Sequence, residues 1–165
     1  MNIKYALSLF AGVLLLASCG KSDNSAANAP AASGATAASA VLAVEITAND
    51  SMKYSLLRID AKAGQEIKIT LTNTGTMPKA VMGHNLIVLQ KGTDIKAFAD
   101  AALGAAATDY IPASMSDKII AHTKLLGAKQ SEEISFKLPE AGEYTFLCSF
   151  PAHYLAGMKG VIVVQ

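Results

Sequence analysis

The residues of this sequence with the most distinctive chemistry lie near its C-terminus. Cys148, His153 and Met158 supply a thiol, an imidazole and a thioether at equal spacings within one short segment. A second imidazole, His84, stands much earlier in the chain, at the head of an apolar run. A thiolate, two imidazoles and a weak, distant sulfur are the donors of copper sites that transfer electrons. The four residues therefore predict a copper site in an electron-carrying protein.

Each of these residues also has an ordinary structural explanation. Cys148 and Met158 could be core fillers. His84 could be a buried histidine with satisfied nitrogens, and His153 a solvated loop residue. Their combination favours the metal, because a lone unpaired cysteine in an exported protein is exposed to oxidation and coordination protects the thiolate.

The overall composition excludes several classes of protein. A chain of 165 residues, 52% of them hydrophobic, leaves room for one compact domain. The 14 Lys and Arg residues less Lys4 of the leader give 13, which balances the 13 Asp and Glu residues. No basic stripe or pattern of aromatic residues indicates nucleic-acid binding. Near-neutrality favours docking through an apolar surface over steering by charge.

The first 18 residues are typical of an export signal. Lys4 precedes an apolar run that is too short to span a bilayer comfortably, and small residues follow it. The sequence Leu16-Ala17-Ser18-Cys19 resembles the lipobox of bacterial lipoproteins, which implies cleavage before Cys19 and a lipid on its sulfur. A plain secretory signal with an incidental cysteine is the alternative.

The chain after this signal peptide divides into two parts. Residues 19–40 comprise the lipidated cysteine and a small, polar stretch that predicts a flexible linker with a reach of roughly 25 Å. Residues 41–165 form the predicted domain. We therefore expect a protein of the cell envelope that is lipid-anchored to a membrane and faces the periplasm.

From residue 41 onward the hydrophobic pattern is that of β-strands. Apolar and polar residues alternate along 42–47, 67–72, 134–138 and 144–148, which is typical of strands with one buried face. Between residues 52 and 59 the alternation changes phase, and a β-bulge would explain the change. About seven strands at this spacing predict an all-β Greek-key β-sandwich.

One segment follows a helical pattern instead. Ile95, Phe98 and Ala102 share one helical face in a segment that starts at Asp94. Thr93 is the predicted N-cap and Gly104 the predicted stop. We expect one short helix or flap inserted in the sandwich, followed by irregular chain to about residue 117.

Three separated parts of the chain resemble the azurins, a family of blue copper proteins with the cupredoxin fold. Met77–Asn85 is similar to their copper-binding strand. Asp109-Tyr110 followed by Ile119–Leu125 is similar to their middle segment, and Tyr144–Gly160 is similar to their copper loop. The resemblance extends over most of residues 41–165.

The resemblance implies a set of copper ligands. His84, Cys148 and His153 would form a trigonal plane around the metal. Met158 would be the axial ligand, and the Gly83 carbonyl would be a weak ligand opposite to it.

The resemblance also implies roles for neighbouring residues. Asn85 would help to hold the Cys148 loop, and the Phe150 backbone N–H would be directed at the Cys148 sulfur, where such hydrogen bonds tune the metal. An apolar surface around His153 would pass electrons to redox proteins such as cytochromes or copper and haem reductases. It would be formed by Met82, Phe150, Pro151 and Ala152.

Two features depart from the azurin pattern. Four residues, Tyr154 to Gly157, separate His153 from Met158, where azurins have three; this is the spacing of the auracyanins. The azurin disulfide has no counterpart, because neither cysteine lies where its partners would. His122 matches a family histidine outside the copper site, and we expect an exposed residue with no ligand role.

We expect a type 1 (blue) copper protein that holds one copper, carries single electrons between redox partners and is not an enzyme. A periplasmic copper storage or delivery protein is the alternative, since it could use the same donors. Cys148 and His153 could also form the nucleophile of a thiol enzyme. No recognisable oxyanion hole or substrate cleft accompanies that pair, and Met158 would have no purpose in it.

Overall fold

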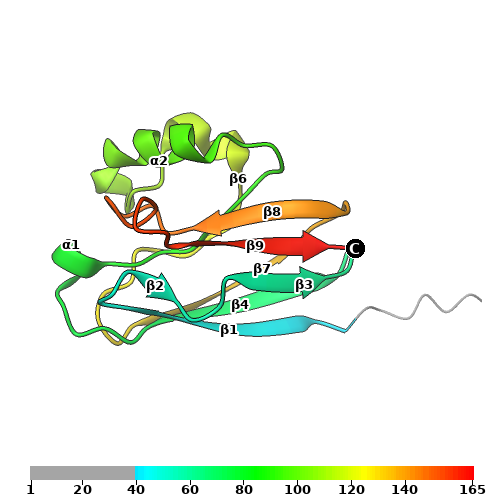
Figure 1. Cartoon of the computed structure of the whole chain (residues 1–165), viewed down its shortest axis with the longest axis horizontal. Helices are drawn as coiled ribbons and strands as arrows, with labels where there is room; N and C mark the ends of the chain where they lie inside the picture. Colours follow the sequence, from blue (N-terminus) through cyan, green and yellow to red (C-terminus); the bar gives the residue numbers. More distant parts are fainter. Residues whose placement is uncertain (1–39) are drawn as a thin grey trace, which may run out of the picture. The chain divides into compact units, whose positions relative to one another are not determined.

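The computed structural model describes residues 40–165, which form a sandwich of two β-sheets (Figure 1). The predicted signal peptide, Cys19 and the linker up to residue 39 lie outside the described residues. Within residues 40–165, none of the helices has the length and apolar character needed to cross a membrane. The strands are β1 (Leu42–Asn49), β2 (Lys53–Tyr54), β3 (Arg58–Ala61), β4 (Glu66–Asn73), β5 (Ile87–Leu89), β6 (Ile119–His122), β7 (Ser131–Lys137), β8 (Gly142–Leu147) and β9 (Lys159–Val164). The helices are α1 (Lys79–Met82) and α2 (Ile95–Leu103), with 3₁₀ turns η1 (Ala106–Thr108) and η2 (Ala113–Lys118).

Each of the two sheets contains one parallel pair of strands. The smaller sheet has the order β2-β1-β4-β7, and β1 runs parallel to β4 from Leu42 opposite Ile67 to Ala48 opposite Asn73. The larger sheet has the order β3-β9-β8-β5-β6, and β3 runs parallel to β9. The remaining pairs are antiparallel. The predicted all-β sandwich is confirmed, with nine strands in the described residues where the sequence suggested about seven.

The core lies between the sheets and follows from the alternation in the sequence. Every second residue of β4 is buried, from Ile67 to Asn73, while the residues between them are half-buried. The same alternation runs along β1 and along the first residues of β8. The cluster of buried apolar side chains continues from these strands to Cys148 and Met158. The predicted sulfur ligands are therefore part of the core packing.

The change of phase between residues 52 and 59 does not come from a bulge. Tyr54 ends β2 in the smaller sheet, and Arg58 begins β3 in the larger sheet. The chain crosses from one sheet to the other between these residues. Tyr54 and Ile59 therefore reach the same core from opposite sides although their positions differ in parity. The predicted bulge is wrong because the alternation restarts when a strand changes sheets.

Helix α2 lies over the larger sheet, beyond β8 (Figure 1). Its buried residues are Phe98 and Ala102, and Ile95 is half-buried, as the helical pattern predicted. Phe98 belongs to a second apolar cluster on the outer face of the sheet, together with Ile87, Leu89 and Leu147. Strand β5 is therefore buried on both faces.

The ends of α2 differ in detail from the prediction. The N-cap is Asp94, whose carboxylate accepts a hydrogen bond from the Ala97 N–H over 3.0 Å. Thr93 instead donates its hydroxyl to the Gln90 carbonyl over 2.7 Å. Gly104 ends the helix as predicted. The chain that follows is not fully irregular, because η1 and η2 lie within it.

The two ends of the sandwich carry different parts of the chain. Helix α1 and the loop between β8 and β9 lie at one end, on the left in Figure 1. The described chain begins at the opposite end, where the Gln65 side chain donates to the Ala40 carbonyl over 2.8 Å. The C-terminal Gln165 lies there too, and its carbonyl accepts from the Ala63 N–H over 2.9 Å.

Candidate metal centre

Three of the predicted ligands come together at the α1 end of the sandwich. The donor atoms of His84, Cys148 and His153 all lie within 4.8 Å of one another. The Cys148 sulfur is 3.4 Å from His153 Nδ1, and the centroids of the two imidazole rings are 4.8 Å apart. His84 and Cys148 are fully buried, and His153 is 2% exposed. The result is a compact and nearly dry set of one sulfur and two nitrogen donors.

His84 is held by its backbone, which belongs to the body of the sandwich. After the single turn of α1 the chain becomes extended at Gly83, and His84 forms an isolated β-bridge with Leu126. The His84 N–H donates to the Leu126 carbonyl over 3.1 Å, and the Leu126 N–H donates to the His84 carbonyl over 2.8 Å. The segment that resembles a copper-binding strand is thus a helical turn and one bridge residue, and β5 begins only at Ile87.

Two neighbours leave little freedom around this bridge. A Cβ on Gly83 would lie 2.7 Å from the Lys79 carbonyl oxygen and 2.8 Å from the Leu125 side chain, so a larger residue has no room. On the other side, the buried Thr123 hydroxyl accepts from the Leu86 N–H over 3.0 Å. The Thr123 N–H donates to the Leu86 carbonyl over 3.0 Å.

Cys148, His153 and Met158 lie on one loop between β8 and β9, and this loop is closed by its own hydrogen bonds. The Cys148 N–H donates to the Met158 carbonyl over 3.1 Å, and the Met158 N–H donates to the His153 carbonyl over 3.0 Å. The His153 N–H donates to the Phe150 carbonyl over 3.1 Å. These bonds fix the loop between the two strands that flank it.

The longer spacing between His153 and Met158 is accommodated by a turn at the surface. Gly157 ends the turn with a φ of +87°, where glycine is favoured, and its N–H donates to the Tyr154 carbonyl over 3.0 Å. Leu155 within the turn is 81% exposed, while Met158 is fully buried. The extra residue is therefore accommodated in a turn at the surface, and Met158 still lies in the core.

Asn85 joins the two ligand segments. Its side-chain oxygen accepts from the Ser149 N–H over 2.9 Å. Its amide nitrogen donates to Ser149 Oγ over 2.9 Å and to the Asp109 carbonyl over 3.0 Å. The Ser149 hydroxyl donates to the Tyr110 carbonyl over 2.7 Å. Asp109 and Tyr110 have φ values of 56° and 61°, which are uncommon for residues other than glycine and which direct both carbonyls to this polar pair.

The Cys148 sulfur lies in an apolar environment that disfavours its charge. Burial raises the pKa of the thiol to about 12, because a thiolate is poorly solvated there. The backbone N–H groups of Asn85 and Phe150 face the sulfur and act in the opposite direction, lowering the pKa. The Asn85 N–H was not among the predicted contacts. In the metal-free protein, no positive charge of the described residues compensates a thiolate at this position. A bound cation would supply that charge and stabilise the thiolate.

Both histidines of the cluster are held in their neutral form. Burial lowers the pKa of His153 to about 4, and the nearby His84 contributes to the shift. Burial also lowers the pKa of His84, while the nearby Asn49 carbonyl and Asp50 carboxylate act in the opposite direction; the carbonyl lies close to the ring without forming a hydrogen bond of normal geometry. Within residues 40–165, neither ring nitrogen of His84 has a hydrogen-bond partner. Buried polar atoms are rarely left unpaired, and neutral imidazole nitrogens bind metals. With the thiol, the set fits a copper ion.

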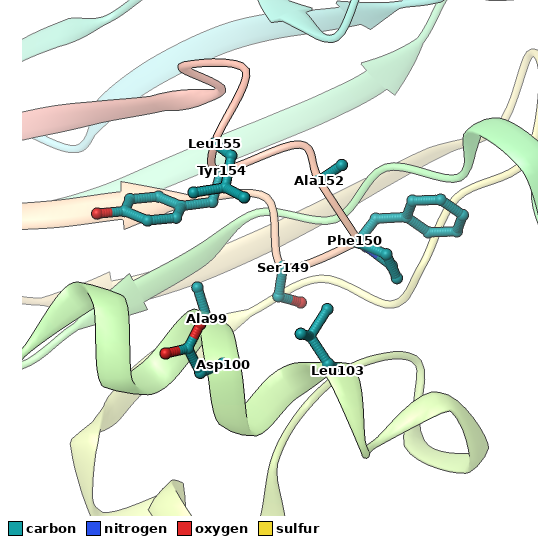
Figure 2. A pocket seen from close by; sticks show the side chains of 9 residues that line it. Ala99, Asp100, Leu103, Ser149, Phe150, Ala152, Tyr154 and Leu155 are labelled. Atoms are coloured by element: carbon teal, nitrogen blue, oxygen red, sulfur yellow. The ribbon is translucent and has the colours of Figure 1, made fainter.

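The predicted docking residues lie on the outer side of the cluster. Met82 and Pro151 are half-buried, and Ala152 is exposed. Figure 2 shows Leu103 of α2 facing the ligand loop across a small cavity of about 40 Å³, which Phe150 also lines. Sequence reasoning did not include three large apolar side chains that are more than half exposed, because exposure of a single leucine or valine leaves no pattern. They are Val81 of α1, Leu103 of α2 and Leu155 of the ligand loop; Leu57, also more than half exposed, lies just before β3.

His122 has no role at the donor cluster, whereas two polar residues that sequence reasoning did not identify do. His122 is exposed on β6 and is not part of the donor cluster. Thr123 and Ser149 are buried and support the ligand segments, and both were missed. Ser149 directly follows Cys148 at the end of an apolar strand, so a buried polar residue in that run was an available signal. Thr123 had no such signal, since it stands between the polar residues His122 and Lys124.

The chain is similar to known copper proteins over most of its described length. Residues 40–165 match the copper binding proteins of the plastocyanin/azurin family. The azurin of Alcaligenes faecalis is 37% identical over 123 residues, which are 72% of this chain and 94% of that protein. The outer membrane protein H.8 of Neisseria meningitidis serogroup B is 42% identical over 116 residues, 67% of this chain. The matched part spans only 61% of that relative's length.

Two solved structures have the same fold. A reduced auracyanin from the photosynthetic bacterium Roseiflexus castenholzii has a TM-score of 0.67 and 38% identity, covering 74% of this chain and 96% of that chain. Auracyanin A, a "blue" copper protein from Chloroflexus aurantiacus, has a TM-score of 0.67 and 31% identity. It covers 76% of this chain and 100% of its own.

Proposed function

We propose a function from one premise: the chain belongs to the plastocyanin/azurin family of copper-binding proteins. It is a blue copper electron carrier with one type 1 copper as its cofactor. We propose that it exchanges electrons between redox proteins in the cell envelope. When bound, the copper supplies reversible one-electron exchange between Cu(I) and Cu(II).

The proposed ligands follow from the donor cluster. His84 and His153 offer neutral imidazole nitrogens, and Cys148 offers its sulfur once the metal displaces the thiol proton, which is released to solvent. Met158 would supply a weak sulfur donor to the copper, and the Gly83 carbonyl a weak oxygen donor. Two observations support this role for Met158: its side chain is fully buried, and its backbone carbonyl accepts a hydrogen bond from the Cys148 N–H.

The observation that carries the proposal is the closed, hydrogen-bonded environment of the donors. Electron transfer is fast only where a site changes its geometry little between Cu(I) and Cu(II), so a fixed framework suits a carrier. None of the three donors of the cluster is more than 2% exposed. A storage or delivery protein must instead release copper readily. The burial and the fixed loop favour the carrier.

We propose that redox partners dock on the apolar surface outside His153. Met82, Pro151 and Ala152 provide this surface, and the exposed Leu155 enlarges it. A cytochrome or a copper or haem reductase with an apolar rim around its own cofactor would fit such a surface. The balance of charges in the chain supports docking with little dependence on ionic strength.

We also propose that a lipid on Cys19 holds the protein on a membrane. Several long acyl chains anchor a protein almost permanently, since each buried methylene contributes ~0.8 kcal/mol. The described chain begins at Ala40, at the end of the sandwich opposite to the donor cluster. An anchor joined to that end through the predicted flexible linker would leave the docking surface free to turn toward soluble partners. The similarity to an outer membrane protein supports an envelope location.

The test of the carrier is a titration of the metal-free protein with Cu(II), followed by visible absorption and voltammetry. An intense blue thiolate-to-copper band that saturates at one equivalent, with reversible one-electron cycling and no metal loss, is the expected result. Tight binding with a pale spectrum, and ready transfer of copper to an acceptor, would favour delivery or storage instead.

The test of the anchor is a Cys19→Ala variant expressed in a bacterium that makes lipoproteins. We expect the variant to be absent from the membrane fraction, while the wild-type chain is retained there after a high-salt wash. The copper domain is the same in both, so the blue band of the recovered protein controls for folding. Equal membrane retention of the variant would exclude lipidation at Cys19.

A further inference from the structure

The buried tyrosine Tyr54 has a hydroxyl that core packing alone does not explain. Tyr54 ends β2, is 5% exposed and packs its ring against Phe146, with centroids 5.7 Å apart and planes tilted by 50°. A phenylalanine would fill the same space and make the same ring contact. A buried phenol needs a hydrogen-bond partner, so the identity of that partner indicates what the hydroxyl does.

The partner of the hydroxyl is the residue that follows the first predicted ligand. Tyr54 donates to the backbone carbonyl of Asn85, and this bond is buried. Tyr54 belongs to the smaller sheet, whereas Asn85 lies just before β5 of the larger sheet. The bond therefore connects the two halves of the sandwich at the donor cluster.

The polar atoms of Asn85 all have tasks at this site. Its side chain binds Ser149 and the Asp109 carbonyl, and its backbone N–H faces the Cys148 sulfur. Its carbonyl is the remaining polar atom, and Tyr54 occupies it. We infer that Tyr54 is a positioning residue of the copper site, which fixes the Asn85 backbone and through it the N–H group that faces the Cys148 sulfur. This inference rests on the proposed copper function.

A direct redox role for Tyr54 is disfavoured by the same geometry. A tyrosine that gives up an electron must also give up its proton, and a backbone carbonyl is too weak a base to take it. Burial raises the pKa of Tyr54 well above its ordinary value, and the nearby Cys148 side chain adds to the shift, so the hydroxyl stays a neutral donor. A fixed, neutral donor is suited to holding the carbonyl in place.

The test compares two tyrosine-to-phenylalanine variants in the full copper-loaded protein. Tyr144→Phe is the matched control, because Tyr144 is buried in the same core and donates to the Glu140 carbonyl over 3.0 Å, at the end of β8 away from Cys148. In Tyr54→Phe the Asn85 backbone is less constrained, so its N–H group stabilises the charge on the sulfur less and the thiolate becomes a stronger donor. We expect the blue band to shift to longer wavelength and the reduction potential to fall. Tyr144→Phe should leave both at the wild-type values.

A second measurement uses the metal-free protein. Hydrogen exchange at the Asn85 amide should become about tenfold faster in Tyr54→Phe, which corresponds to the loss of one typical buried hydrogen bond. In Tyr144→Phe this amide should exchange at the wild-type rate. Circular dichroism of each variant checks that the sandwich has folded.

The outcomes separate this inference from the proposed function. A wild-type protein without a blue band would reject the copper carrier itself. A blue wild-type protein whose band, potential and Asn85 exchange are unchanged in Tyr54→Phe would overturn the role of Tyr54. Equal shifts in Tyr54→Phe and Tyr144→Phe would also overturn it, because the effect would then reflect general loosening of the core.

Discussion

His84 and the loop from Cys148 to Met158 reach the same cluster by different means. His84 is fixed through its backbone, by the bridge to Leu126, and its ring has no hydrogen-bond partner within residues 40–165. The loop is closed on itself by hydrogen bonds from Cys148 to Met158 and from Met158 to His153. We call these the strand side and the loop side of the centre. The rigid body of the sandwich places one donor, and a short preorganised segment places the others.

The largest effect should come from removing the sulfur on the loop side. Cys148→Ser replaces the thiolate with a hydroxyl that cannot supply the charge-transfer band, so we expect complete loss of the blue colour. Circular dichroism should still show the folded sandwich, because the strand side is unaltered. His122→Ala, which changes an exposed residue outside the cluster, should keep the full band. A blue Cys148→Ser protein would disprove the ligand assignment.

The next effect concerns the lack of space on the strand side. Gly83→Ala places a methyl group 2.7 Å from the Lys79 carbonyl oxygen, and backbone cannot easily move away. We expect the free energy of unfolding to fall by about 3 kcal/mol, as for an overpacked core, and copper to bind more weakly. Urea unfolding of the metal-free protein measures the first effect. Gly104→Ala is the control, since its nearest neighbour would be 3.8 Å away, and it should change stability little.

A pH titration distinguishes the two histidines in the metal-free protein. Their pKa values are lowered in the folded state, that of His153 to about 4, while unfolded histidines titrate near 6.5. Between these values the unfolded chain binds more protons, so the free energy of unfolding falls as the pH is lowered through this window. The slope should be at most about 1.4 kcal/mol per pH unit for each histidine.

Urea unfolding between pH 7 and pH 4 measures that slope. We expect His153→Gln to remove the larger part of the pH dependence of stability and His84→Gln the smaller part. Most of the free-energy cost of burying a histidine would then belong to the loop side. A stability that is flat across the window in the wild-type protein would contradict the lowered pKa values.

The smallest effect concerns backbone strain on the loop side. Gly157 has a φ of +87° and open space around it. Gly157→Ala therefore meets no steric clash, and its only cost is that alanine disfavours a positive φ. We expect a loss of about 1 kcal/mol. Gly157→Asn should cost less, because asparagine tolerates left-handed conformations better than alanine. An equal cost for both variants would mean that the side chain, and not the backbone, is the cause.

The sequence predicted the parts of this molecule that depend on periodic patterns and donor chemistry. The alternation in β4 and the helical spacing of Phe98 and Ala102 reflect local rules and were confirmed. The donors His84, Cys148 and His153 were chosen by their chemistry and lie together as expected.

The sequence did not predict features that depend on how distant segments meet. The crossing between sheets after Tyr54 produces the same change of phase as a bulge, so periodicity cannot distinguish the two. The helical turn of α1 is too short for a periodic pattern. The Tyr54 bond to Asn85 joins residues that are 31 positions apart, and no local rule connects them.

The near-complete burial of the donors has a consequence for how quickly the protein can be loaded. Only 2% of the surface of His153 is exposed and Cys148 is fully buried, so a copper ion at the protein surface cannot reach the Cys148 sulfur directly. Uptake must then wait for a transient opening of the loop side. Above a modest copper concentration, the loading rate should become independent of that concentration and report the opening frequency alone. The same barrier would slow escape, so a protein that is slow to fill would also be slow to empty.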